Sequence, residues 1–267
     1  MALPVRNFRI RLTQGQLFCR EVGNGQAIVF LHGSWGEGSE WLPVMELLER
    51  ECHSLAPDLL GCGDSDRPKV HYSLALQVEC LAAYLDALRL QKVVLVGREL
   101  GGWVAARYAA KYPEQVKGLV LMAAEGVQIT TTPNRWQRER WLAARPSLYG
   151  GLLRSLFPLA RFLKRHHGIE QLLALQQTLR RSPVACQILF QRRRTEIQAE
   201  WMSDQIPWLK PPVLILQGEG DRSVATALNR AYSQAPNVDL RLIPEAGEAM
   251  IQTHPEAIAE EIRRFLT

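Results

Sequence analysis

The chain has 267 residues, of which 47% are hydrophobic and 22% are charged. This length and balance predict one large domain with a substantial core. No stretch approaches the roughly 18 consecutive apolar residues of a membrane span, and residues 1–6 lack the features of a secretory signal, so we expect a cytoplasmic protein. The five cysteines are odd in number and lack metal-ligand spacing, which favours reduced packing thiols over a disulfide framework or a zinc site.

The net charge of +5 is uneven along the chain. Residues 125–211 carry 14 Lys or Arg against 6 Asp or Glu, so the excess of positive charge belongs to this segment. No nucleic-acid motif accompanies these residues, and solvated helix faces are therefore favoured over a DNA or RNA groove. A peripheral contact with an anionic lipid, a carrier protein or an acidic substrate stays open.

The expected elements begin with two short alternating runs, residues 8–12 and 17–22, which predict an antiparallel hairpin turned at Gln14-Gly15. Buried apolar runs then alternate with amphipathic stretches, which is typical of a parallel, doubly wound α/β sheet. The expected strands are residues 27–31, 53–56, 92–96, 116–122, 213–217 and 238–243, and the expected helices are residues 39–50, 74–90, 100–111, 225–235 and 255–266.

Residues 126–209 are rich in helix signals and separate two blocks of the same sheet. Leu152, Leu153, Leu156, Leu159 and Leu163 recur there at helical spacing. An insertion of this length predicts a helical cap, or lid, over a core domain formed by residues 1–125 and 210–267.

Residues 94–103, VLVGRELGGW, predict a buried strand that enters a glycine-tight turn and then a helix. The turn resembles a nucleophile elbow, in which a sharp strand-to-helix turn exposes one side chain above the sheet. Glu99 stands where such an enzyme carries its serine. Residues 242–248, LIPEAGE, resemble the segment that ends in the general-base histidine, and Glu248 stands at that place.

Three further segments extend the resemblance. The strand at residues 27–31 is followed by HGSWG, similar to a loop that supplies one backbone N–H of an oxyanion hole, here that of Ser34; the second donor would be the N–H of Leu100. Asp221 follows a buried strand, which resembles the position of the triad acid in enzymes with such an elbow. Residues 57–68, PDLLGCGDSDRP, look like a turn of the epoxide-hydrolase, haloalkane-dehalogenase and haloperoxidase branches.

Together these segments resemble the α/β-hydrolase superfamily across nearly the whole chain. The resemblance implies an eight-stranded, mostly parallel sheet with a helical cap, but it names no substrate. A serine nucleophile needs an imidazole to take its proton, and both partners are missing, so no ordinary serine-hydrolase cycle is expected. Of the six histidines, only His166 and His167 could face the site from the lid.

The fold would bring Glu99, Asp221 and Glu248 together, with Glu125 as a neighbour. Two carboxylates about 4 Å apart repel by about 4 kcal/mol at an effective dielectric near 20, which is about three pKa units. The helix N-terminus offsets only about 0.3–1 kcal/mol, or up to about 2 when partly buried. The cluster therefore needs a shared proton, a cation, or an arginine such as Arg98 or one from the lid.

Three functional readings follow. The first is a protein without a cofactor that binds a small, mostly apolar ligand under the cap and has little or no serine-hydrolase activity. The second is a hydrolase, isomerase or cyclase in which Glu99 acts as nucleophile or acid and Glu248 as base. The third is a divalent-cation site, whose oxygen ligands would suit Mg²⁺, Ca²⁺ or Mn²⁺.

Overall fold

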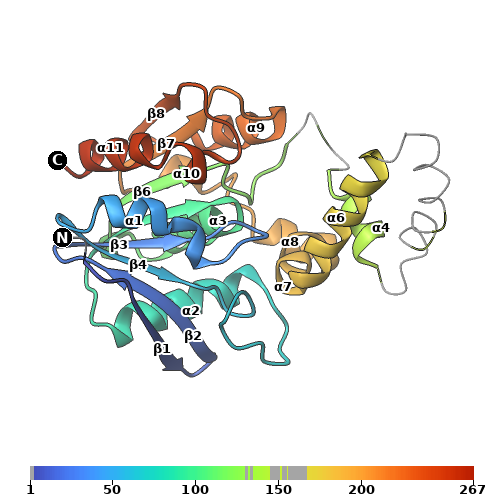
Figure 1. Cartoon of the computed structure of the whole chain (residues 1–267), viewed down its shortest axis with the longest axis horizontal. Coiled ribbons are helices and arrows are strands. Elements are labelled where there is room, and N and C mark those ends of the chain that lie inside the picture. The colour runs from blue at the N-terminus through green and yellow to red at the C-terminus, as the bar shows by residue number, and fades with distance from the viewer. Residues whose placement is uncertain (1–2, 130–131, 133–134, 145–150, 152–154, 156–166) are drawn as a thin grey trace.

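A single eight-stranded sheet runs through the protein in the computed structural model, which describes residues 3–129, 132, 135–144, 151, 155 and 167–267 (Figure 1). The strand order is β1-β2-β4-β3-β5-β6-β7-β8. β1 and β2 form the expected hairpin, but its turn is Thr13-Gln14 rather than Gln14-Gly15. β2 pairs with β4 antiparallel, and the remaining neighbours are parallel. The strands are β1 (Arg6–Leu12), β2 (Gly15–Val22), β3 (Gln26–Leu31), β4 (Cys52–Pro57), β5 (Val93–Arg98), β6 (Val116–Met122), β7 (Val213–Gly218) and β8 (Val238–Ile243).

Helices cover both faces of the sheet, because the central strands carry apolar residues at successive positions and side chains alternate between faces. In β3, Ile28 and Phe30 pack on one face with the helices α1 and α11, while Val29 and Leu31 pack on the other with α2, α3 and α9. These helices are α1 (Leu42–Leu47), α2 (Leu74–Ala87), α3 (Glu99–Lys111), α9 (Ser223–Tyr232) and α11 (Pro255–Leu266); the short elements are η1 (Gly38–Trp41), η2 (Pro113–Gln115) and α10 (Met250–Thr253).

Two expected helices differ in length from the structure. The expected helix at residues 39–50 is divided into η1 and α1, and α1 carries Pro43 in its first turn, where the missing N–H costs nothing. The expected helix at residues 74–90 ends at Ala87, and Arg89 just beyond it takes the left-handed conformation with φ of 55°. That conformation cannot continue a right-handed helix.

Residues 126–209, here called the inserted segment, join β6 to β7. Their helices stand at one end of the sheet (Figure 1). The five leucines at helical spacing and His166 lie outside the described residues. The elements are α4 (Gln137–Ala143), α6 (His167–Arg181), α7 (Pro183–Cys186), the π-helix η3 (Gln187–Gln191), α8 (Arg194–Ala199) and η4 (Ile206–Trp208).

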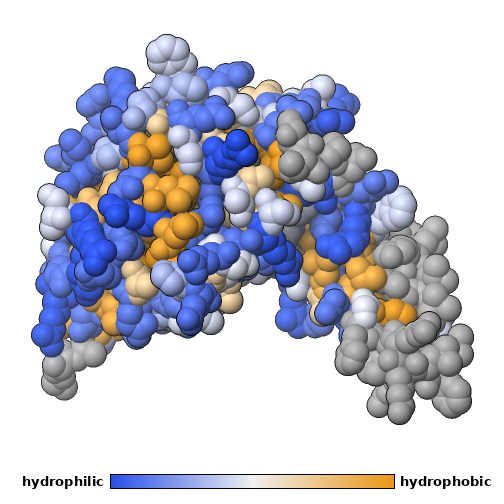
Figure 2. All heavy atoms as spheres, turned by 90° about the horizontal axis from the view of Figure 1, so that it is seen from above, coloured by the Kyte–Doolittle hydropathy of each residue, from blue (hydrophilic) through white to orange (hydrophobic). Residues whose placement is uncertain are grey.

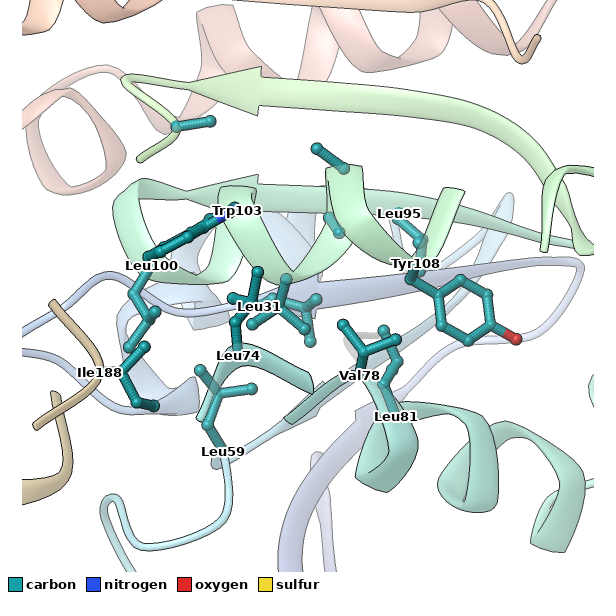
Figure 3. Close-up of a cluster of buried hydrophobic side chains, with 14 of the residues drawn as sticks. Leu31, Leu59, Leu74, Val78, Leu81, Leu95, Leu100, Trp103, Tyr108 and Ile188 are labelled. Atoms are coloured by element: carbon teal, nitrogen blue, oxygen red, sulfur yellow. The ribbon is translucent and has the colours of Figure 1, made fainter. Parts of the chain in front are cut away.

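The inserted segment packs onto the core of the sheet. Ile188 points toward Leu100 of α3, within a cluster of buried side chains from both parts (Figure 3). The indole N–H of Trp103 in α3 donates to the carbonyl oxygen of Glu200 in the inserted segment at 3.2 Å. These contacts fix the segment at the end of the sheet where α3 begins.

All five cysteines are buried. Burial raises the pKa of Cys19, Cys62 and Cys80 to about 12. None of the described helices combines the length and the apolar character that crossing a membrane requires.

Candidate functional site

Glu99 lies at the turn between β5 and α3, and two glycines allow the backbone segments to approach closely there. A Cβ on Gly97 would lie 2.6 Å from the carbonyl oxygen of Gly101, and one on Gly101 would lie 2.3 Å from that of Leu31. Glu99 itself has φ of 48°, a left-handed conformation that costs a non-glycine residue about 1–2 kcal/mol. The residues that the sequence predicted as an elbow thus form a tight, strained strand-to-helix turn.

The carboxylate of Glu99 is held by the protein itself. The backbone N–H of Ser34 donates to Oε2 of Glu99 at 2.9 Å, and the guanidinium of Arg98 lies 3.1 Å from Oε1. The N–H of Ser34 is the donor that the sequence assigned to an oxyanion hole. Leu100, assigned as the second donor, is fully buried in the first turn of α3. One predicted anion-binding donor is therefore occupied by a side chain of the same chain.

Glu40 is a second carboxylate at this site, and the sequence analysis missed it. Its Oε1 accepts the N–H of Gly33 at 2.7 Å, and its Oε2 lies 3.8 Å from the guanidinium of Arg98. Burial raises the pKa of Glu40, while the charges of His32 and Arg98 and the Gly33 N–H oppose the rise. Glu40 lies in an ordinary amphipathic stretch, so no motif marks it.

Glu125 is buried at the end of β6 and paired with a residue of the inserted segment. Both terminal nitrogens of Arg135 contact its carboxylate, at 2.8 and 2.5 Å, in a bidentate geometry. Burial raises the pKa of Glu125, Arg135 opposes this, and Glu99 adds a smaller increase. The Arg135 guanidinium also lies 4.4 Å from the ring centre of Trp136. The sequence showed the basic excess of this segment but not which arginine meets Glu125.

Asp221 and Glu248 follow β7 and β8, the two strands at the sheet edge. Oδ2 of Asp221 accepts the N–H of Gly218 at 3.0 Å. Burial raises the pKa of Asp221, and the nearby charge of Glu248 raises it further. The side chain of Glu248 is 43% exposed and lies 3.3 Å from Arg222.

The three sequence-predicted residues line one small cavity of about 70 Å³. Glu99, Asp221 and Glu248 share its wall with Arg98 and Arg135. Glu99 and Glu248 each have an arginine partner, Arg98 and Arg222, whereas Asp221 accepts a backbone N–H. Within the described ranges, no group of three or more His, Cys, Asp or Glu side chains is arranged to hold a metal ion.

A larger cavity of about 470 Å³ lies between the inserted segment and the core residues Trp103 and Glu125. Arg135 lines both cavities and so stands between them. Seen from above, the molecular surface is hollowed between the sheet and the inserted segment (Figure 2). Four tryptophans that the sequence analysis did not single out line the larger cavity: Trp103, Trp136, Trp141 and Trp201.

Comparison with known proteins agrees with this geometry. Residues 28–261 match the alpha/beta hydrolase family. The 2-hydroxy-6-oxo-2,4-heptadienoate hydrolase of Pseudomonas putida is 41% identical over 117 residues, and this match covers only 42% of each protein. The pimeloyl-acyl-carrier protein methyl ester esterase of Xanthomonas axonopodis pv. citri is 28% identical over 251 residues, 92% of this chain and 96% of the esterase. A meta-cleavage product hydrolase from Pseudomonas fluorescens has the same fold, with a TM-score of 0.73, 22% identity and 97% of both chains covered.

Proposed function

Because the chain belongs to the alpha/beta hydrolase family, we propose that it uses the family's fold to bind a small, largely apolar molecule beneath the inserted segment, which acts as its cap. In this proposal the protein has little or no serine-hydrolase activity. Its relatives include hydrolases named for a heptadienoate and for a methyl ester. In this proposal the chain keeps the family's ligand-binding architecture without its serine-hydrolase chemistry.

The contact between Ser34 and Glu99 carries the proposal. Serine hydrolases aim backbone N–H groups at the negative oxygen that develops in the transition state. Here the Ser34 N–H already donates to the Glu99 carboxylate at 2.9 Å. A second negative oxygen about 4 Å away would be repelled by about 4 kcal/mol at an effective dielectric near 20. The Ser34 N–H thus stabilises the Glu99 carboxylate rather than the negative oxygen that forms when an ester reacts.

The larger cavity supports the binding part of the proposal. Its volume of about 470 Å³ lies within the range of small-molecule sites, and buried side chains such as Trp103, Leu189 and Ile197 line it. Native mass spectrometry of the purified protein under mild conditions would detect a retained ligand. The proposal would be contradicted if an apolar dye did not bind the protein, or if no small molecule displaced the bound dye.

The chemical part has a direct test. A fluorophosphonate probe labels activated serines, and we expect no label at the elbow of the wild-type protein. Wild type, Glu99→Gln and Glu248→Gln should hydrolyse a panel of esters, epoxides and haloalkanes at equal, background rates. Robust labelling of any serine of the protein would overturn the proposal.

A second function is favoured by one observation: Glu99, Asp221 and Glu248 share the walls of the 70 Å³ cavity, where the pKa of Asp221 is raised. Such carboxylates can serve as an acid and base pair, or Glu99 can attack a carbon electrophile with Glu248 activating the water. The same panel distinguishes this function. A rate that falls about 100-fold or more in Glu99→Gln and Glu248→Gln would establish it.

A further inference from the structure

We propose that the molecule bound in the 470 Å³ cavity is a planar, apolar carboxylic acid, whose carboxylate is held by Arg140 and Arg194. This inference rests on the proposed binding function and adds the chemical class of the ligand. It is carried by the charges, the aromatic side chains and one unpaired hydroxyl at the cavity wall.

Charge at the cavity wall is unbalanced. Arg135, Arg140 and Arg194 line the cavity against the single carboxylate of Glu125, which Arg135 already pairs with. Across the described parts of the chain, neither Arg140 nor Arg194 has a carboxylate oxygen within 4.0 Å. Among the described residues, the cavity therefore presents two positive charges without a carboxylate partner, which favours an anionic ligand.

Other arginines close to Arg140 and Arg194 in the sequence do form ion pairs with nearby glutamates. Arg138, two residues before Arg140, pairs with Glu139 at 2.9 Å, and Arg192, two residues before Arg194, pairs with Glu200. These two partners do not line the cavity. Arg140 belongs to α4 and Arg194 begins α8, so separate elements bring the two guanidinium groups to the same cavity. A guanidinium pairs well with the planar carboxylate group, because both offer two parallel hydrogen-bonding positions.

Aromatic side chains determine the shape of the ligand body. The Trp103 indole is held by its hydrogen bond to Glu200, and the Trp136 ring stacks on Phe190 with centres 5.3 Å apart and planes at 29°. Arg135 lies over the same Trp136 ring. Indole walls held in this way favour a flat, conjugated or aromatic body.

Thr132 provides an independent sign of a polar ligand. Its hydroxyl oxygen is buried at the cavity wall and has no hydrogen-bond partner among the described residues. A buried hydroxyl without a partner costs about 1–3 kcal/mol. A carboxylate or carbonyl oxygen of the ligand would accept its proton and remove that cost.

Isothermal titration calorimetry with two matched probes tests the inference. The anion 1-naphthoate and the neutral 1-naphthamide share size and shape, so they differ mainly in charge. We expect the full-length protein to bind naphthoate at least about tenfold more tightly than naphthamide. The double variant Arg140→Gln/Arg194→Gln should lose that preference and keep its affinity for naphthamide, and Thr132→Val should weaken naphthoate binding several-fold.

Arg193→Gln is the matched control, because Arg193 precedes Arg194, carries the same charge and does not line the cavity. It should bind naphthoate as the wild type does. Equal affinity of wild type for the two probes, or an equal loss in Arg193→Gln, would overturn the anionic inference and leave the apolar site standing. Failure of both probes to bind at millimolar concentration would instead contradict the proposed function itself.

Discussion

At the scale of single residues, the site is governed by how each carboxylate is neutralised. Arg98, adjacent to Glu99 in sequence, contacts Glu99 at 3.1 Å and Glu40 at 3.8 Å. Arginine is suited to this role because its charge persists at every accessible pH. The sequence alone indicates Arg98 as a candidate partner of Glu99. It does not indicate Glu40, whose contact depends on the tertiary packing of η1.

Glu40 leads to a prediction about pH. Burial raises the pKa of Glu40 above its ordinary value of 4.5, so the folded protein holds that proton more tightly than the unfolded chain. The resulting stabilisation is fully present below about pH 4.5 and is lost as the pH rises through the raised pKa. Glutamine keeps an oxygen for the Gly33 N–H but carries no charge. The stability of Glu40→Gln relative to wild type should therefore increase from about pH 4 to about pH 8.

Urea unfolding at several pH values in that interval measures this difference. Glu46→Gln on α1, at an exposed position, controls for the removal of one negative charge. A relative stability of Glu40→Gln that is constant or decreases with pH would show that the Glu40 proton is not linked to folding in this way.

At the scale of elements, the strands and helices follow from the hydrophobic pattern, while the turn at Glu99 depends on backbone clearance. Gly97 lets β5 and α3 meet, and Gly101 lets α3 approach the end of β3, at distances that no side chain allows. The sequence indicated this close backbone approach, because Gly97 and Gly101 flank Glu99 at the turn. The expected helix at residues 39–50 was less accurate, since a periodic pattern does not distinguish a 3-10 turn from an α-helix.

The turn leads to a second prediction. Gly97→Ala would place Cβ 2.6 Å from a backbone oxygen, which no rotamer change relieves. We expect a loss of free energy of unfolding of about 1–3 kcal/mol or more, measured by chemical denaturation. Gly168→Ala on α6 is the matched control, because nothing lies within 4 Å of its Cβ. It should be neutral or stabilise by up to about 1 kcal/mol. Equal stability of both variants would disprove the crowding at the turn.

At the scale of the whole molecule, the inserted segment and the sheet are joined by an ion pair and an edge-to-face aromatic contact. Arg135 contacts the Glu125 carboxylate, and Trp136 beside it lies 6.2 Å, edge to face, from Trp35 of the loop after β3. Arg135 also stands between the two cavities. One side chain therefore connects the position of the segment with the charge balance of the site.

This junction leads to a third prediction. Arg135→Met leaves the buried Glu125 carboxylate unpaired and should lower the free energy of unfolding by about 3–5 kcal/mol. The double variant Arg135→Met/Glu125→Gln should recover most of that loss, because the buried charge is gone. A double-mutant cycle by urea unfolding gives the coupling. Additive losses in the two single variants would show that the pair is not coupled.

The hydrophobic pattern and the glycine positions determined, from the sequence alone, the order and type of the main elements, the mostly parallel sheet and the turn at Glu99. These features are local, because they depend on residues near one another in the chain. Only the tertiary structure decided which arginine neutralises which carboxylate, that the Ser34 N–H donates to Glu99, and which tryptophans form the larger cavity. Glu40 and Arg135 are far from Glu99 in sequence, and it is the packing of separate elements that brings their charges to one site.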